Sequence, residues 1–293
     1  MSKMVVYSLI KQSSMRFNQL RNLKTARRFF DPKNDVAFKK IFGVESNKPL
    51  LLSLLNLTLR RKDDDMIEDV NLLPQEKIPQ FKKSILDVVC CDKKGRRYIV
   101  EIQNKRLSSF IQRLEYCASR TYSEQLFQGA DYLELKPVIL LTIVNHNIFP
   151  NSVQYISYHT NREEEEINKC FLPNISYIFI ELPKFDKCRE QLKTSEDYWI
   201  HLLKEASNET KPPKEVPDEI QKAYDILEQY NWTEVERISY EKTRMAILDD
   251  EDAIRTAVGE AVSEIAKKLL KEGVSHEIIS KVSDLSTSRV GQK

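Results

Sequence analysis

Apolar residues recur along the chain with two spacings, one typical of helices and one typical of strands. Every third or fourth position is apolar in the helical segments, whereas short runs rich in Val, Ile and Tyr mark the strands. Helices that precede and interrupt the strands predict an α/β domain with a mixed sheet. The expected helices cover 36–42, 50–59 and 110–128, and the expected strands cover 67–73, 85–91, 97–103, 137–144 and 175–181.

The central stretch 84–103 is expected to form a β-hairpin. Its turn includes Gly95, which suits the left-handed backbone that ends a three-residue hairpin loop. With that loop, Asp87 lies directly opposite Glu101, and their Cβ atoms are about 5 Å apart. Gln103 shares their face because side chains alternate along a strand. The opposite face carries residues expected in the core, which are Leu86, Val88, Cys90, Tyr98, Val100 and Ile102.

Two carboxylates within apolar strands are costly to bury unless a positive charge lies between them. A divalent metal ion is one solution, because hard cations bind carboxylate oxygens. The alternative is that Asp87 and Glu101 are surface acids on a half-exposed hairpin. The hairpin by itself leaves both interpretations open.

The chain changes character beyond residue 198. Pro212 and Pro213 indicate a linker, and the apolar residues that follow recur at helical spacing among many charges. These helices are expected to form a small bundle or a helical hairpin. The expected organisation is therefore a basic N-terminal extension that is poorly ordered, an α/β domain, a linker and a C-terminal helical region, covering 1–30, 31–200, 201–217 and 218–293.

Charge is distributed unevenly between the two halves of the chain. Residues 1–150 carry 26 Lys and Arg against 16 Asp and Glu, a net of +10, whereas residues 151–293 carry 20 against 28, a net of −8. A basic first half fits a polyanionic partner. The segment 1–30 has seven basic residues and no acid, which is compatible with a nucleic-acid-binding arm, an organelle transit sequence or an unstructured extension.

Composition also indicates the compartment. Charged residues make up 31% of the chain and hydrophobic residues 41%, and no apolar run is long enough to span a membrane, so a soluble protein is expected. The five cysteines are odd in number and irregular in spacing, which fits neither a zinc site nor a disulfide framework. We therefore expect a reducing compartment, the cytoplasm.

With these residues in view, the chain resembles the recombination-promoting nuclease and transposase family of the PD-(D/E)XK nuclease superfamily. The resemblance runs from Asp31 to about Phe185, with a similar helical tail at 268–290. It rests on the order of several motifs rather than on any one of them. These motifs are DPKNDVAFKKIFG at 31–43, LDV at 86–88, EIQ at 101–103, R-x-x-Y at 113–116, QLFQGADYLELKPV at 125–138 and FIELPKF at 179–185.

The resemblance implies a restriction-endonuclease-like core, in which a mixed sheet is flanked by helices, together with the C-terminal helical region. Enzymes of this superfamily hold Mg²⁺, or Mn²⁺, on strand carboxylates and cut DNA phosphodiester bonds. Carried over by position, Asp87 and Glu101 are the metal ligands and catalytic acids, and Gln103 stands where the superfamily usually has lysine. Asp35 is the matching acid on the first helix, and it is equally well placed to cap that helix.

Several basic residues are candidates for binding DNA phosphates. Gln103 can orient groups only through hydrogen bonds, so a nearby lysine would have to supply positive charge. Arginine is well shaped for paired hydrogen bonds to phosphate, which favours Arg113. A structural pair of Arg113 and Tyr116 is the alternative. The DNA-binding candidates are Arg113, Lys39, Lys40, Lys105 and Arg120.

The expected function is that of a metal-dependent DNA endonuclease associated with recombination or transposition. The alternative is a catalytically weak or inactive module on the same fold, whose basic half binds DNA while its acidic helices bind protein. The expected partners are DNA and a second copy of the chain, joined through the C-terminal helices, and no membrane is expected.

Overall fold

The computed structural model describes residues 27–73, 87–275 and 278–279 of the 293-residue chain. The chain divides into two compact units, of which the first extends to Arg237 and the second begins at Ile238. All strands described belong to the first unit. No helix in these described ranges is long and apolar enough to cross a membrane.

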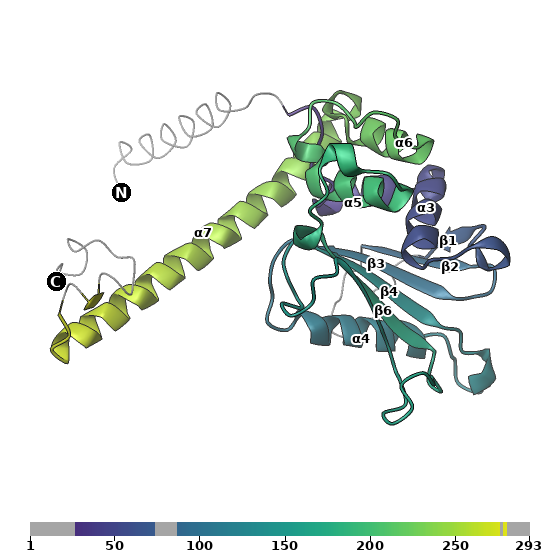
Figure 1. The fold of residues 1–293 in the computed structure, drawn as a ribbon, viewed down its shortest axis with the longest axis horizontal. Coiled ribbons are helices and arrows are strands. Elements are labelled where there is room, and N and C mark those ends of the chain that lie inside the picture. Colours follow the sequence, from purple (N-terminus) through teal and green to yellow (C-terminus); the bar gives the residue numbers. More distant parts are fainter. Residues whose placement is uncertain (1–26, 74–86, 276–277, 280–293) are drawn as a thin grey trace. The chain divides into compact units, whose positions relative to one another are not determined.

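A six-stranded sheet forms the centre of the first unit (Figure 1). Its strands are β1 (Val70–Leu72), β2 (Val88–Asp92), β3 (Arg97–Gln103), β4 (Val138–Val144), β5 (Ile156–Thr160) and β6 (Ile175–Glu181). The strand order is β1-β2-β3-β4-β6-β5, with β3, β4 and β6 parallel and the outer strands antiparallel to their neighbours. The predicted mixed α/β sheet is therefore confirmed.

The register of the predicted hairpin is also confirmed. Val88 pairs with Val100 across β2 and β3, which is the alignment expected from a three-residue loop. The N–H of Asp92 donates to the carbonyl of Arg96 over 3.0 Å, and Gly95 has a φ of 78°, in the left-handed region. A one-residue slip would have turned every side chain of the strand to the other face.

Helices lie on both sides of the sheet. The helices of the first unit are α2 (Asp35–Phe42), α3 (Lys48–Thr58), α4 (Phe110–Ser123), α5 (Ser195–Glu205) and α6 (Asp218–Leu227). The last helix, α7 (Glu234–Lys271), continues into the second unit. Figure 1 shows α4 on one side of the sheet and α3 and α5 on the other. Contacts among α2, α3, α5 and α6 make these helices a second packed layer.

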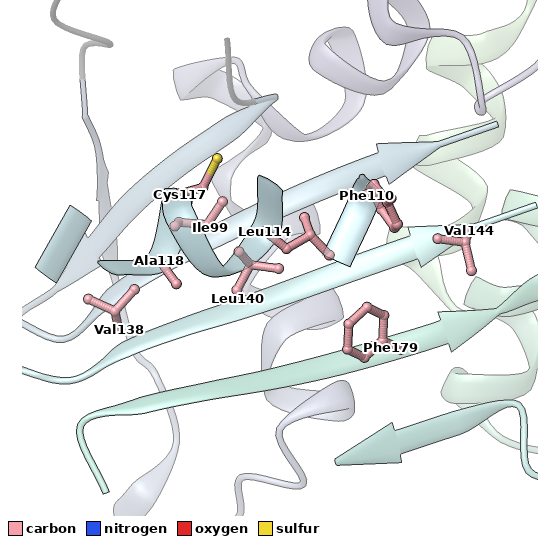
Figure 2. Close-up of a cluster of buried hydrophobic side chains, with 9 residues drawn as sticks. All are labelled: Ile99, Phe110, Leu114, Cys117, Ala118, Val138, Leu140, Val144 and Phe179. Carbon is pink, nitrogen blue, oxygen red and sulfur yellow. The ribbon is translucent and has the colours of Figure 1, made fainter. Parts of the chain in front are cut away.

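The core between α4 and the sheet explains the position of α4. Apolar residues at helical spacing point from α4 toward β3, β4 and β6, and they bury one face of the sheet (Figure 2). Because the parallel strands are covered on both faces, their sequences are nearly continuous apolar runs, as in β4. The cluster comprises Ile99, Phe110, Leu114, Cys117, Ala118, Val138, Leu140, Val144 and Phe179.

Four residues expected in the N-terminal extension, 27–30, are described by the structure. Residues 1–26 lie outside the described part of the chain, but 27–30 belong to the first unit. Phe29 packs edge-on against Tyr224 with ring centroids 5.1 Å apart, and Phe30 lies 4.3 Å from the ring of Trp232. Local sequence patterns could not predict these contacts, because both partners lie about 200 positions further along the chain.

The segment 201–217, expected to be a linker, is packed into the first unit. Helix α5 continues through its first part, where Leu202 and Leu203 are buried, and α6 contacts α2 and α3. The two prolines interrupt the helices without separating domains. After residue 218, where a small bundle or a helical hairpin was expected, the described residues form α6 in the first unit and α7, one continuous helix of 38 residues.

Candidate active site

Asp87 and Glu101 lie side by side at the start of β2 and near the end of β3. Continuing the hairpin register by one residue places them directly opposite each other. The Ile102 N–H donates to Oδ2 of Asp87 over 2.9 Å, and the Asp87 N–H donates to the Glu101 carboxylate. Each acid is thus held by the backbone of the other strand, which fixes both side chains at one place.

Both carboxylates are buried. Glu101 is 4% exposed, and the side chain of Asp87 is 8% exposed. Burial, reinforced by the charge of Asp87, raises the pKa of Glu101 to about 8. Burial and the charge of Asp35 also raise the pKa of Asp87, although the Ile102 hydrogen bond and Lys39 oppose this shift. The ionised form of each acid is therefore disfavoured, and a bound cation would stabilise both negative charges.

Two cationic side chains approach the pair without neutralising it. Lys39 Nζ lies 3.6 Å from Oδ1 of Asp87 and is partly exposed. Lys39 and Arg113 both lower the pKa of Glu101 through their charge. Among the residues described, however, neither lies within ion-pair distance of the Glu101 carboxylate. The alternative interpretation, that the two acids lie on the surface of a half-exposed hairpin, is wrong because both side chains are buried.

Gln103 connects the strand to α4. Its Oε1 accepts a hydrogen bond from Nη2 of Arg113 over 3.0 Å, and its Nε2 donates to the carbonyl of Lys105 over 3.0 Å. The amide therefore holds the Arg113 guanidinium beside the carboxylate pair. The sequence proposed both residues for the site but did not predict their contact, because it depends on where α4 packs.

Asp35 is exposed in the first turn of α2. Asn34 is the helix cap, since its Oδ1 accepts a hydrogen bond from the Val36 N–H over 2.9 Å. The interpretation of Asp35 as the cap is therefore wrong. Its negative charge raises the pKa of Asp87, so Asp35 lies near the carboxylate pair.

Two of the expected DNA-binding residues have partners elsewhere. Lys40 pairs with Glu236, and its Nζ lies 4.8 Å from the ring centroid of Trp232. Arg120 pairs with Glu124 at 2.5 Å, one helical turn further along α4. Lys105 contributes its backbone carbonyl to Gln103. Of the five basic candidates, Lys39 and Arg113 are the two that the fold brings to the carboxylates.

Sequence reasoning missed Thr142. It lies next to Glu101 in the parallel pairing of β3 and β4, and it is fully buried. Its Oγ1 has no hydrogen-bond partner among the described residues. A polar residue within the otherwise apolar strand VILLTIV was the available signal.

Residues 32–257 match the model of a family described as PD-(D/E)XK nuclease family transposase. The chain belongs to this family. No curated protein and no solved structure matches the chain. Membership supports a nuclease- or transposase-like function with DNA as the substrate, and PD-(D/E)XK nucleases generally use divalent metals. The matched range contains the hairpin, α4 and every candidate residue described above.

The donors in this PD-(D/E)XK family member suit a hard divalent cation. Carboxylate oxygens are the ligands that Mg²⁺ prefers, and Mg²⁺ commonly uses one or two of them together with waters and substrate phosphates. No group of three or more His, Cys, Asp and Glu side chains gathers into a metal site within the described residues. Asp87 and Glu101 therefore fit a cation that completes its coordination with water and phosphate oxygens.

Proposed function

We propose that this family member is a Mg²⁺-dependent DNA endonuclease that hydrolyses phosphodiester bonds, with Mn²⁺ as an alternative ion. The observation that carries the proposal is the buried pair of Asp87 and Glu101, whose pKa values are raised even though Lys39 lies 3.6 Å from Asp87. A protein gains nothing in stability from such a pair. Its retention in the core of the first unit supports a role in binding a cation.

The pair would provide two fixed carboxylate ligands. When bound, the divalent cation lowers the pKa of a water and withdraws charge from the phosphate that is attacked. Asp87 and Glu101 would hold that cation on the strands, and the hydrogen bonds from Ile102 and Asp87 backbone N–H groups would keep the two carboxylates oriented. Asp35 would orient water at the exposed side of the site.

Positive charge would come from α2 and α4. Arg113 would contact a phosphate oxygen with guanidinium nitrogens not used by Gln103, and Lys39 would stabilise negative charge that develops during cleavage. Gln103 would position Arg113 and would take no part in proton transfer. Lys105 and Arg120 would contact the DNA backbone further from the cut.

The family description supports a role in recombination or transposition as the setting for this cleavage. None of the five cysteines, all of which the structure describes, forms a disulfide, which is in keeping with a cytoplasmic protein.

Relaxation of supercoiled plasmid tests the proposal. We expect nicking by the purified protein in Mg²⁺ and none in EDTA. Glu101→Gln keeps the shape of the side chain but removes one ligand charge, and it should abolish nicking. DNA binding without nicking in either Mg²⁺ or Mn²⁺ would instead support an inactive DNA-binding module on the same fold.

A further inference from the structure

The long helix α7 carries an exposed row of apolar side chains within the second unit. The row follows the three- and four-residue spacing of a heptad repeat, which places its members on one face of the helix. Ile254, Val258 and Ile265 are 61%, 56% and 57% exposed. We call this row the apolar stripe, and it consists of Ile247, Ile254, Val258, Ala261 and Ile265.

The described residues after α7 leave the stripe uncovered. Ile279 packs against Ala266, with Leu270 and Val274 beside it. This cluster lies on another flank, because Ala266 is rotated by about 100° from Ile265 around the helix axis. A long helix in a protein owes most of its stability to packing of an apolar face. The stripe therefore needs a partner to cover it.

Two copies of the stripe are complementary when the helices run antiparallel. If Ile254 faces the partner's Ile265, then Val258 faces the partner's Ala261, and the same contacts repeat by symmetry. The contact would thus have an Ile–Ile layer at each end and two Val–Ala layers between them. A second copy of this chain is the occupant that the pattern fits, because a two-fold contact uses the same surface on both molecules.

Charges next to the stripe select the antiparallel direction. Residues 249–252 are all acidic, whereas the segment 267–271 contains three lysines. The antiparallel alignment places each acidic segment beside the basic segment of the other copy, with Glu251 opposite the partner's Lys268. A parallel alignment would place the acidic segments side by side, and like charges in contact are strongly unfavourable.

We propose that α7 is a dimerisation helix and that the α7 helices of two copies pair antiparallel, stripe against stripe. The contact region from Ile247 to Lys271 is about 38 Å long at the usual rise of an α-helix. This length provides several layers of apolar contact. The inference concerns assembly and does not depend on the proposed nuclease activity.

Sedimentation equilibrium of the full-length chain provides the first test. We expect a dimer at micromolar concentrations. Val258→Asp should weaken dimerisation at least about a hundredfold, because it buries an unpaired charge in the contact. Ile238→Asp is the matched control, since Ile238 is also exposed on α7 but lies away from the stripe. Circular dichroism will show whether each variant keeps its helix content.

Exchange of charges tests the direction of the helices. In the antiparallel dimer, Glu251→Lys and Lys268→Glu should each weaken dimerisation about tenfold, and the double variant should restore it. In a parallel dimer, each single variant would instead relieve repulsion and tighten the contact. A tightening by both single variants would overturn the proposal, as would a wild-type chain that stays monomeric at about 100 µM.

Discussion

Two buried glutamates stand near the ends of parallel strands in the same sheet, and the fold treats them differently. Glu181, at the end of β6, is 1% exposed and accepts hydrogen bonds from the N–H groups of Ile148 and Phe149 at 2.6 and 3.1 Å. Lys184 lies 2.5 Å from its second oxygen. Glu101, near the end of β3, faces another acid and has a pKa raised by burial and by that acid.

This difference is the basis for our proposal that Glu181 has a structural role and Glu101 a functional one. A buried carboxylate is tolerated when nearby donors and a cation satisfy it, as they do for Glu181. The environment of Glu101 supplies one backbone donor and a neighbouring negative charge, and Arg113 and Lys39 act on it only through their charge. Burial is nearly the same at both positions, but among the described residues the Glu101 carboxylate has a second acid beside it and no ion pair of its own. This difference is why we propose the Asp87 and Glu101 pair as the site for a bound cation.

The largest expected effect comes from replacing each glutamate by glutamine. Glu101→Gln should abolish plasmid cleavage and leave the free energy of unfolding unchanged or higher, because it removes a repelled buried charge. Glu181→Gln should lower the free energy of unfolding by about 3 kcal/mol, since it leaves Lys184 buried without its carboxylate, while folded molecules cleave normally. Urea unfolding and cleavage rates below the unfolding midpoint measure both effects. Equal loss of activity in the two folded variants would contradict the proposed difference between the roles of Glu101 and Glu181.

The second prediction concerns the Gln103 amide. Gln103→Ala removes the acceptor that holds Arg113, so the cleavage rate should fall by about tenfold to a thousandfold, the range for one positioned group. Gln103→Lys should also be slower than the wild type, because an ammonium group would repel the Arg113 guanidinium. Single-turnover cleavage at saturating Mg²⁺ measures both variants. Wild-type rates in both would show that Gln103 and Arg113 do not act together.

Two adjacent lysines on α2 allow a finer test. Lys39 lies at the carboxylate pair, whereas Lys40 is turned toward Glu236 and Trp232. Lys39→Ala should reduce the slope of log affinity for DNA against log salt by about 0.9, the value for one phosphate contact. Lys40→Ala should leave that slope unchanged. Fluorescence anisotropy in EDTA at several salt concentrations provides the slopes, and equal slopes for both variants would contradict this assignment.

The smallest effect is expected at Thr142, beside Glu101. Thr142→Val removes a buried hydroxyl that has no described partner, so the metal-free protein should gain about 1 kcal/mol in free energy of unfolding. Thr58→Val is the matched control, because the Thr58 hydroxyl donates to the carbonyl of Leu54 over 2.8 Å. That variant should lose about 1 kcal/mol. Urea unfolding in EDTA measures the free energy of unfolding of both variants. A lower value for Thr142→Val than for the wild type would contradict the view that the Thr142 hydroxyl makes no hydrogen bond.

The fold follows from the sequence where local signals are strong. The hairpin register followed from the loop around Gly95 and from the alternation of residues in both strands, and this register brought Asp87 and Glu101 together. Strand β5 was not predicted, because only Ile156 and Tyr158 of its five residues ISYHT are apolar and it forms the edge of the sheet. Helix α5 was also missed, although Thr194 and Asp197 form a capping box at its start.

Details of the site depend on contacts between distant segments. The hydrogen bond between Gln103 and Arg113 requires α4 to pack on the sheet, and the pairing of Lys40 requires Glu236, about 200 positions away. No local pattern encodes either contact. The different surroundings of Glu101 and Glu181 likewise depend on loops and neighbouring strands, so the two acids could not be distinguished by sequence alone.

Titration of the protein with Mn²⁺ in a calorimeter, with Mg²⁺ as competitor, tests the central claim most directly. We expect one site per wild-type chain that is retained in Glu181→Gln and lost in Glu101→Gln. Binding requires ionised carboxylates, and the pKa of Glu101 is raised to about 8, so affinity should increase as the pH rises toward 8 and level off above it. Equal binding by the wild type and Glu101→Gln, or affinity that does not change between pH 6 and pH 8, would contradict the account.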